Sequence, residues 1–374
     1  MQRREFVRDL AAVGAAAATV PKALLAADQD IGASHIPRWR GFNLQGRFGW
    51  PGHPYEGPAY EEADFEAMAE WGFDFARLPL AYWSWGSRDD WSQIREEPLR
   101  HLDNAVELGK QYGVHVNLCF HRIPGYCVSG REQEPADLFS GRRAERQRAL
   151  EAAVFHWKAF ARRYKGIPNR HLSFDLLNEP PKMRSYEGYL EERYEEIVRA
   201  LVAGIREVDA SRLIFADGLD LGQAPVPGIV DLGLVQSNRG YQPKAVSHYT
   251  ATWVPRDEYE TMRAPSWPLV DDSGRTWDRS RLQAEMIDRW RPVLERGVQV
   301  HVGEFGCFNR TPHPVALAWL GDCLALWQQA GWGFAMWNLR GAFGVLDSER
   351  TDVAYEDYKG HKLDRAMLEL LRSH

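Results

Sequence analysis

The feature of the sequence that most constrains the fold is an eightfold alternation of short apolar runs with longer amphipathic segments. The apolar runs, each bounded by Gly, Pro or Asn, are residues 40–44, 73–79, 114–121, 171–179, 212–217, 232–237, 298–305 and 333–339. Runs of this length and composition are typical of buried strands, and most are followed by a pattern with helical periodicity. Eight strand–helix units within residues 39–374 predict a single-domain α/β protein with a (β/α)8 TIM barrel. A doubly wound open sheet is the structural alternative, and the segment after the fifth run, residues 219–228, is the least helical.

The first 27 residues read as a targeting segment. Arg3 and Arg4 precede an apolar stretch, residues 10–20, that is too short to span a bilayer. Paired arginines before a weakly apolar core resemble a twin-arginine export signal of bacteria, with an ordinary amphipathic first helix as the alternative. We therefore expect residues 1–27 to be an export signal and residues 28–38 a linker. The mature chain is expected to be periplasmic or extracellular and to lack a membrane span.

Charge and motifs exclude several classes of function. The chain has 46 Lys and Arg against 52 Asp and Glu, a net charge of -6, which does not suit nucleic acid and does suit a neutral polymer. No H-E-x-x-H, Walker-type or G-x-S-x-G motif is present. We expect neither a metal nor another cofactor. Four cysteines in so long a chain do not form a disulfide scaffold, and the sequence leaves their pairing open.

Two glutamates stand where a barrel would carry its chemistry. Glu179 ends the apolar run SFDLLNE and Glu304 ends VHVGE. In a barrel the C-terminal strand ends form the active face, and a carboxylate there is desolvated unless it has a partner or faces a cleft. Two carboxyl groups with different pKa values are the groups that hydrolyse glycosidic bonds. A structural ion pair is the alternative for either glutamate alone.

The segments ARLP, LLNEP, GEFG and GFAMWNLRGAFGVLDSER, in this order and spacing, resemble glycoside hydrolase family 5. The family comprises cellulase-type retaining β-glycosidases, and the resemblance covers nearly all of residues 39–374. It implies that Glu179 is the general acid/base and that Glu304 is the nucleophile. It also implies a polysaccharide or oligosaccharide substrate and no cofactor.

The resemblance carries four supporting residues. Arg77 matches the arginine that lies beside the nucleophile and keeps Glu304 ionised. His121 matches the histidine that lines the subsite of the cleaved sugar. Asn178 matches the asparagine that binds the sugar 2-hydroxyl, and Trp337 matches the tryptophan that forms the floor for a pyranose ring. A core histidine and a core tryptophan remain the alternatives for His121 and Trp337.

One position departs from the family. The family usually carries His-x-Tyr after the sixth strand, whereas SNRGYQP places Arg239 at the histidine position and keeps Tyr241. Tyr241 is expected to donate to Glu304. An arginine would hold Glu179 more anionic, which is unfavourable for a general acid. Three outcomes are open: Arg239 turns away, His248 substitutes, or the pH profile moves to the acid side.

Aromatic residues in the expected loops suggest a sugar-binding cleft, with ordinary packing of long loops as the alternative. The set is Trp50, Trp83, Trp85, Trp91, Trp253, Trp267, Trp277 and Trp337, with Phe48, Tyr55, Tyr82 and Tyr126. The long segment of residues 254–278 is expected to form one wall of the cleft.

The sequence thus predicts retaining hydrolysis of a β-glycan, with an endo-β-1,4-glucanase as the first expectation. A β-1,3-glucanase, a mannanase and a xyloglucanase of the same family are the alternatives. From another class, a catalytically impaired carbohydrate-binding protein is the alternative that Arg239 encourages. The glycan, endo or exo action and the oligomeric state are open.

Overall fold

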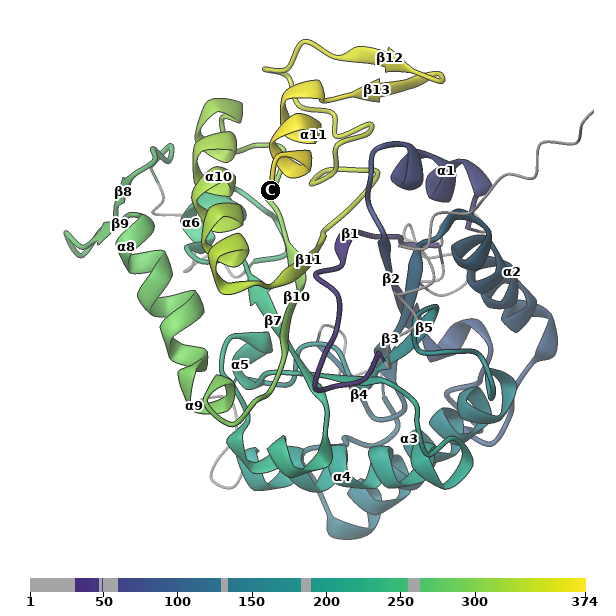
Figure 1. The fold of residues 1–374 in the computed structure, drawn as a ribbon. Coiled ribbons are helices and arrows are strands. Elements are labelled where there is room, and N and C mark those ends of the chain that lie inside the picture. The colour runs from purple at the N-terminus through teal and green to yellow at the C-terminus, as the bar shows by residue number, and fades with distance from the viewer. Residues whose placement is uncertain (1–30, 47–48, 50–59, 129–133, 183–189, 255–262) are drawn as a thin grey trace, which may run out of the picture.

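The computed structural model describes residues 31–46, 49, 60–128, 134–182, 190–254 and 263–374. Its centre is a closed parallel barrel with helices around it (Figure 1). The barrel strands are β1 (Arg40–Asn43), β2 (Phe75–Ala81), β3 (His115–Ile123), β5 (Leu172–Asp175), β6 (Ile214–Asp217), β7 (Val235–Gly240), β10 (Val300–Phe305) and β11 (Gly333–Met336). The sheet runs from β2 through β1 and β11 round to β3, and β2 also pairs with β3. This pairing closes the sheet, so the (β/α)8 barrel is confirmed and the open sheet is excluded.

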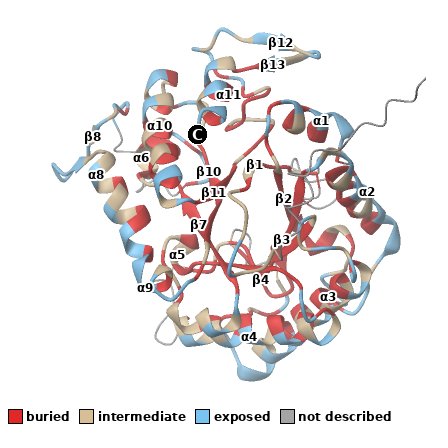
Figure 2. Ribbon diagram, viewed as in Figure 1, coloured by how far each residue is buried: buried red, intermediate tan, exposed pale blue. Residues whose placement is uncertain are grey.

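Long helices pack around the barrel where the sequence predicts them. They are α1 (Glu62–Glu70), α2 (Glu96–Tyr112), α3 (Arg143–Arg163), α4 (Leu190–Val208) and α10 (His313–Ala330), and α11 (Arg365–Arg372) follows the last strand. Each buries one face against the barrel and exposes the other, as Figure 2 shows. The left-handed backbone at Gly113, with φ 69°, ends α2, a conformation that glycine adopts without steric cost.

Two of the expected helices are irregular. After β6 the chain makes only α5 (Leu219–Gly222) and the 3-10 turn η5 (Pro227–Leu232). The chain before β10 is a succession of short pieces: α8 (Arg279–Leu282), the π-helical turn η6 (Gln283–Ile287), η7 (Asp288–Trp290) and α9 (Arg291–Leu294). The remaining short elements are the turn η2 (Tyr82–Ser84), α6 (Lys244–Ser247), β4 (Tyr126–Cys127), and the hairpins β8 (Leu269–Val270) with β9 (Thr276–Trp277) and β12 (Glu356–Tyr358) with β13 (His361–Leu363).

Several of the expected strand boundaries are wrong, and for β2 and β7 the reason is the same. β2 extends past Arg77 to Ala81, β7 is displaced to 235–240 and so contains Arg239, and β5 stops at Asp175 before Asn178. Polar residues were expected to end strands, but here they point into the barrel and find partners there. A buried ion pair lets a charged residue occupy the middle of a strand.

An aromatic cluster fills the lower end of the barrel, where the strands begin. Its members are Trp39, Phe75, Leu213, Phe215, Val235 and Ala335, with His115 and His301 among them. Trp39 stacks on His115 with ring centroids 3.8 Å apart. Burial lowers the pKa of both histidines to about 3, so they are neutral at physiological pH.

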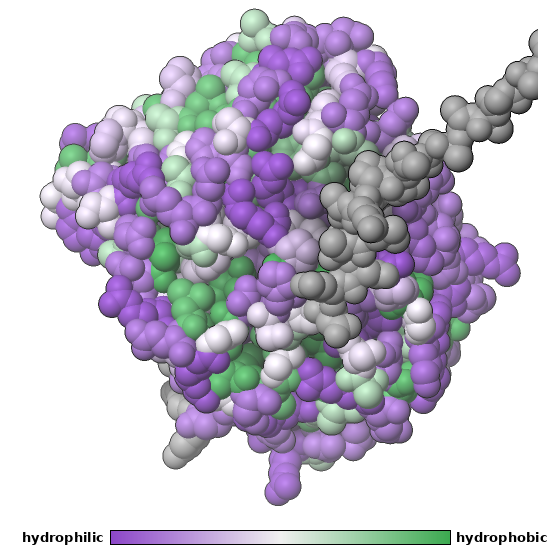
Figure 3. Space-filling model, in the orientation of Figure 1, coloured by the Kyte–Doolittle hydropathy of each residue, from purple (hydrophilic) through white to green (hydrophobic). Residues whose placement is uncertain are grey.

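The segment of residues 31–39 crosses this lower end, which faces the viewer in Figure 1. Ile31, Ala33 and Ile36 pack against the cluster and cover it. From the same side, most of the outer surface is hydrophilic and apolar residues show in patches between polar ones (Figure 3). The lower end is therefore closed, and the polar chemistry lies at the other end of the strands.

Two further findings concern the described residues. None of the helices among them is both long and apolar enough to cross a membrane. The four cysteines are free and buried, so the pairing that the sequence left open is absent. The expected export signal, residues 1–27, lies outside the described residues.

Candidate active site

Arg77 is the centre of a charged layer above the aromatic cluster. Its Nη1 donates to Glu304 Oε1 at 2.6 Å, and its Nε donates to Asp175 Oδ2 at 2.9 Å. It also donates to Asn43 Oδ1 at 3.0 Å and to Asn178 Oδ1 at 2.8 Å. One buried guanidinium on β2 therefore joins β1, β5, the segment after β5, and β10. Two carboxylates offset its desolvation, and the pKa of Arg77 stays above its ordinary value.

Glu304 lies on β10 and is held from two sides. Arg77 contacts Oε1, and the hydroxyl of Tyr241, just past β7, donates to Oε2 at 3.2 Å. The expected donation from Tyr241 is thus present. The Nη2 of Arg239 lies 3.5 Å from Oε1. With both oxygens engaged, this carboxylate has a fixed orientation and a compensating positive charge.

Glu179 has a different environment. It follows β5 in a left-handed conformation, φ 48°, with its backbone N–H on Asp217 Oδ2 at 2.8 Å and its carbonyl accepting from Tyr126 at 2.6 Å. Its side chain is 16% exposed, and Arg239 Nε lies 3.5 Å from its Oε1. The backbone is anchored while the carboxyl group reaches the solvent-accessible side of the layer.

Arg239 points into the barrel and not directly at Glu179. Its Nη2 donates to Asp217 Oδ2 and, at 2.8 Å, to Asn178 Oδ1, and its Nη1 donates to Ser237 Oγ at 2.9 Å. Arg239 has not turned away from the acid completely, because its Nε still lies 3.5 Å from Glu179 Oε1. His248 packs edge-on against the ring of Tyr241, with centroids 4.9 Å apart.

The carboxyl group of Glu179 has a strongly raised pKa, about 8. The main cause is burial, and the negative charge of Glu304 is the second. Arg239 lowers the pKa of Glu179, as expected, but these two effects outweigh it. The expected direction of the Arg239 effect is thus confirmed, but burial and the charge of Glu304 keep the pKa of Glu179 above its ordinary value.

His121 and Trp337 lie together at the upper end of the barrel. Their ring centroids are 5.8 Å apart, with the His121 ring on β3 and Trp337 just after β11. Burial and the neighbouring Arg122 hold the pKa of His121 well below its ordinary value, so the ring is neutral. The structure thus gathers Arg77, His121, Asn178, Glu179, Arg239, Tyr241, Glu304 and Trp337 at one end of the barrel, with His248 beside Tyr241.

Two aspartates belong to the site and were not among the residues proposed from sequence. Asp175 pairs with Arg77, and Asp217 pairs with Arg239. Burial, followed by the charge of Asp217, raises the pKa of Asp175 to about 6. The signal was available in part, because Ser173 and Asp175 are polar and two apart within a buried strand, and so point to the same side.

Several aromatic residues expected in a cleft are core residues. Trp85 is 1% exposed, packs on Phe120 and donates to His156 at 3.0 Å. Trp83, Trp91, Tyr82 and Tyr126 are also buried, whereas Trp253 is 55% exposed. Phe48, Trp50 and Tyr55 lie outside the described residues.

The expected cleft wall at 254–278 is also not borne out in its described part. The β8–β9 hairpin lies to the side of α8 and away from the barrel centre (Figure 1), and Trp267 Nε1 donates to Asp322 of α10 at 2.8 Å. This part packs on the outside of the barrel, where Asp322 of α10 accepts from Trp267. Residues 255–262 lie outside the described residues.

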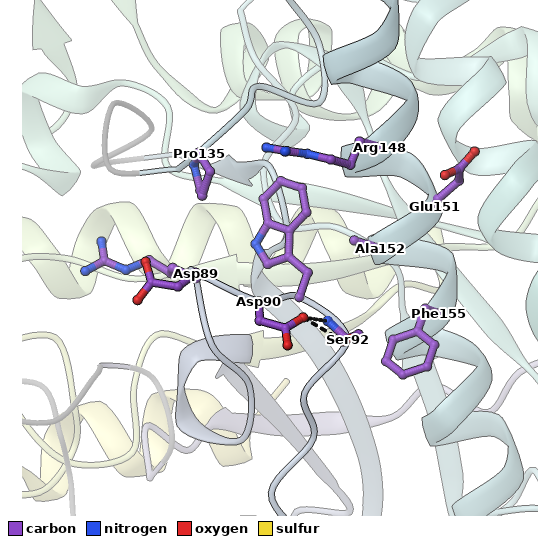
Figure 4. Close-up of a pocket in the computed structure, with 10 residues that line it drawn as sticks. Asp89, Asp90, Ser92, Pro135, Arg148, Glu151, Ala152 and Phe155 are labelled. Atoms are coloured by element: carbon purple, nitrogen blue, oxygen red, sulfur yellow. Dashed lines mark hydrogen bonds between the residues drawn. The ribbon is translucent and has the colours of Figure 1, made fainter.

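A hollow of about 590 Å³ lies apart from this layer, between the segment after β2 and α3 (Figure 4). Trp91 and Arg148 both line it, and the guanidinium of Arg148 lies 5.3 Å from the Trp91 ring. Neither Glu179 nor Glu304 lines it. Its wall holds charges of both signs but no paired carboxyl groups with a shared cation, so we place the chemistry at the charged layer. The described residues contain no cluster of three or more His, Cys, Asp or Glu suited to a metal ion.

Known proteins similar to this chain include enzymes that act on glucans and a glycoside hydrolase. Endoglucanase C of Acetivibrio thermocellus is 24% identical over 321 residues, 79% of this chain and 88% of that protein. Glucan 1,3-beta-glucosidase D of Emericella nidulans is 36% identical over 131 residues, 32% of this chain and 15% of that protein. A crystal structure described as a glycoside hydrolase matches with a TM-score of 0.83 and 36% identity, covering 90% of this chain and 99% of the other.

The family model described as Cellulase (glycosyl hydrolase family 5) matches residues 27–342. That match includes every strand of the barrel and the whole charged layer. The chain belongs to glycosyl hydrolase family 5 and is a glycoside hydrolase.

Proposed function

We propose that the enzyme cleaves internal β-1,4 bonds of a glucan with retention, using Glu304 as nucleophile and Glu179 as general acid/base. The observation that carries the proposal is that Glu304 and Glu179 both lie 3.5 Å from nitrogens of Arg239 but have unequal environments. Glu304 receives a 2.6 Å hydrogen bond from Arg77, whereas Glu179 is partly exposed and its pKa is raised to about 8. One group is thus suited to attack and the other to hold a proton near neutral pH.

In the first step, a Glu304 carboxylate oxygen forms a bond to the anomeric carbon. The bond from that carbon to the leaving oxygen breaks, and Glu179 gives its proton to this oxygen. Retention requires the two carboxyl groups to be about 5–5.5 Å apart. Both lie 3.5 Å from nitrogens of Arg239, which is consistent with groups facing each other across the substrate.

In the second step, Glu179 takes a proton from water, and the water oxygen displaces Glu304 from the anomeric carbon. Glu179 changes from acid to base because the charge of Glu304 beside it changes. The negative charge of Glu304 is one cause of the raised pKa of Glu179, and the covalent intermediate removes that charge. The pKa of Glu179 then falls, which favours its action as a base.

Asn178 is suited to bind the sugar 2-hydroxyl. Its Oδ1 accepts from both Arg77 and Arg239 at 2.8 Å, which fixes the orientation of the amide. Its Nδ2 is buried and has no hydrogen-bond partner among the described residues. A substrate hydroxyl would satisfy this donor, and that contact strengthens as the transition state forms.

The relatives support two glucan linkages. Endoglucanases match most of the chain, which favours β-1,4-glucan, and glucan 1,3-beta-glucosidases match about a third of it, which makes β-1,3-glucan the second candidate. Reducing-sugar release from β-1,4-glucan, laminarin, mannan and xyloglucan, with Glu304→Gln as control, decides between them. Release from β-1,4-glucan by wild type alone supports the proposal, whereas release only from another polymer replaces the substrate. Equal release by the variant would contradict the role of Glu304.

We also propose that residues 1–27 direct export, on the strength of Arg3 and Arg4 before an apolar stretch. In a bacterial host with a twin-arginine pathway, wild type is expected in the periplasm or medium. The double change Arg3→Lys and Arg4→Lys is expected to keep the enzyme in the cytoplasm. Export of both proteins to the same extent would contradict the proposal.

A further inference from the structure

An ion pair between two neighbouring strands lies beneath the Asn178–Glu179 dipeptide. Arg239 of β7 and Asp217 of β6 are 1% and 0% exposed and pair through Nη2 and Oδ2. The same Nη2 donates to Asn178 Oδ1 at 2.8 Å, and the same Oδ2 accepts from the backbone N–H of Glu179 at 2.8 Å. One ion pair therefore holds both residues of the dipeptide, one through its side chain and one through its backbone.

The barrel provides room for this arginine through two glycines. A Cβ on Gly222 would lie 2.5 Å from Cγ of Arg239, and a Cβ on Gly303 would lie 2.7 Å from its Nη1. Both separations are shorter than van der Waals contact allows. The neighbouring strand and turn thus leave space for the whole length of the side chain, and a shorter side chain at 239 would leave that space unfilled.

The backbone of Glu179 needs such support. Its φ of 48° is unfavourable for a residue with a Cβ and persists only where surrounding contacts fix it. Asp217 holds the N–H, and the hydroxyl of Tyr126 holds the carbonyl at 2.6 Å. Because the carboxyl group is itself 16% exposed, its position follows from this anchored backbone more than from contacts of its own.

We propose that Asp217, oriented by Arg239, is a positioning residue that sets where Glu179 delivers its proton. This inference rests on the proposed role of Glu179 as general acid/base. The Arg239–Asp217 pair acts on Glu179 through the backbone N–H of Glu179, which donates to Asp217. Because Asp217 contacts no substrate atom, replacing it should slow hydrolysis most for substrates whose leaving oxygen needs a proton from Glu179.

The charges around Glu179 give a second readout. Glu304 on β10, Arg239 on β7, Asp217 on β6 and Arg77 on β2 all act on its pKa. Asp217 and Glu304 raise the pKa of Glu179, and the two arginines lower it. Removing the charge of Asp217 therefore lowers this pKa and moves the basic limb of the kcat/KM profile to lower pH.

The experiment compares Asp217→Asn with wild type on two substrates, an unsubstituted cello-oligosaccharide and dinitrophenyl β-cellobioside. The first needs protonation of its leaving oxygen, and the second does not. We expect kcat/KM on the oligosaccharide to fall about 10²-fold, the cost of misplacing a catalytic group, and kcat/KM on the aryl glycoside to stay within about threefold. The basic limb is expected to shift to lower pH.

Ser237→Ala is the matched control. Ser237 also lies on β7, and its hydroxyl accepts from Nη1 of the same guanidinium at 2.9 Å, whereas Asn178 accepts from Nη2. This variant is expected to keep both rates and the pH profile. The pair of changes Asp217→Asn and Arg239→Gln removes both buried charges together, so it reads the dependence on the leaving group if Asp217→Asn alone does not fold. The shift of the basic limb is read from Asp217→Asn only, because Arg239 lowers the pKa of Glu179 and its loss acts in the opposite direction.

Equal losses on the two substrates in the folded variants, with an unchanged pH profile, would overturn the inference, because they indicate a structural role only. Glu179→Gln separates this failure from failure of the proposed function. If Glu179→Gln shows the leaving-group dependence and Asp217→Asn does not, only the inference fails. If Glu179→Gln shows none, the acid/base role of Glu179 fails, and the inference fails with it.

Discussion

The lower and upper layers of the barrel interior come from the same strands but treat polar groups differently. At the lower end, β2, β3 and β10 place Phe75, His115 and His301 together, and burial keeps both histidines neutral. A few residues further along β2 and β10, Arg77 and Glu304 form a 2.6 Å ion pair.

The comparison of the two layers shows where this barrel accommodates charged side chains. Each lower-layer histidine has a neutral partner, such as Ser173 Oγ at 2.7 Å from His115 Nε2, so the layer needs no ions. The upper layer holds two arginines and several carboxyl groups that compensate one another. Burying charged side chains costs desolvation energy and adds no apolar packing. A buried cluster of charges therefore indicates a functional site. The lower layer should therefore control stability, whereas the upper layer should control activity and stability together.

The largest effect should come from Glu304→Gln. The amide cannot attack the anomeric carbon, so we expect kcat on the preferred glucan to fall on the order of 10⁴-fold or more. The melting temperature should fall as well, because the amide removes the negative charge that pairs with Arg77 in the buried layer. Glu192→Gln, at an exposed site on α4, is the control and should keep full activity. Activity of Glu304→Gln within tenfold of wild type would remove the upper layer from catalysis.

Arg77→Met should reduce both activity and stability. It leaves Asp175 and Glu304 buried without their shared cation. Removing one member of a buried ion pair costs about 3–5 kcal/mol. Urea unfolding at pH 7 measures this loss, and hydrolysis of the preferred glucan measures activity. A variant as stable as wild type would mean that Asp175 and Glu304 do not depend on the charge of Arg77.

Phe75→Leu changes the lower layer alone. Phe75 is 1% exposed and packs against His115 and His301. A substitution of similar volume in a core costs about 1 kcal/mol, and we expect kcat/KM to change less than twofold. Unfolding and kinetic assays on one preparation test both. A large loss of kcat/KM without loss of stability would show that the two layers are not separable.

The lower layer should also make stability depend on pH. The pKa of His115 is about 3 in the folded state, below the ordinary value of about 6.5 in the unfolded chain. Below pH 6.5 the unfolded state therefore binds more protons than the folded state. The contribution is complete above that pH and decreases as the pH falls toward 3.

Urea midpoints between pH 7.5 and 5 measure this slope, and His115→Gln should make it shallower. His35→Gln, at an exposed site, is the matched control. The same slope in wild type and both variants would contradict the neutral state of His115.

Much of the fold and part of the site could be predicted from the sequence. The eight apolar runs correspond to the eight barrel strands, because an apolar run between turn residues is a local signal. Glu179, Glu304 and Tyr241 were placed at the correct end of the barrel for the same reason. Strand ends were less predictable where Arg77 and Arg239 continue inward, since their partners come from other strands.

The roles of Asp175 and Asp217 required the structure. Each pairs with an arginine that is 98 and 22 residues away in the chain, respectively. The burial of Trp85 also depends on packing between β3 and α3, which the periodicity of one segment does not show. Local pattern thus located the two glutamates at the ends of their apolar runs, and contacts between distant residues determined their environments.

The central claim is that the upper layer divides its two glutamates into a nucleophile and a proton donor. A fluorinated cellobiosyl fluoride, which forms the covalent intermediate and slows its hydrolysis, tests this directly when proteolysis and mass spectrometry locate the label. The account predicts one cellobiosyl group on the peptide that contains Glu304, and none in Glu304→Gln. A label on Glu179, or turnover with inversion and no label, would contradict it.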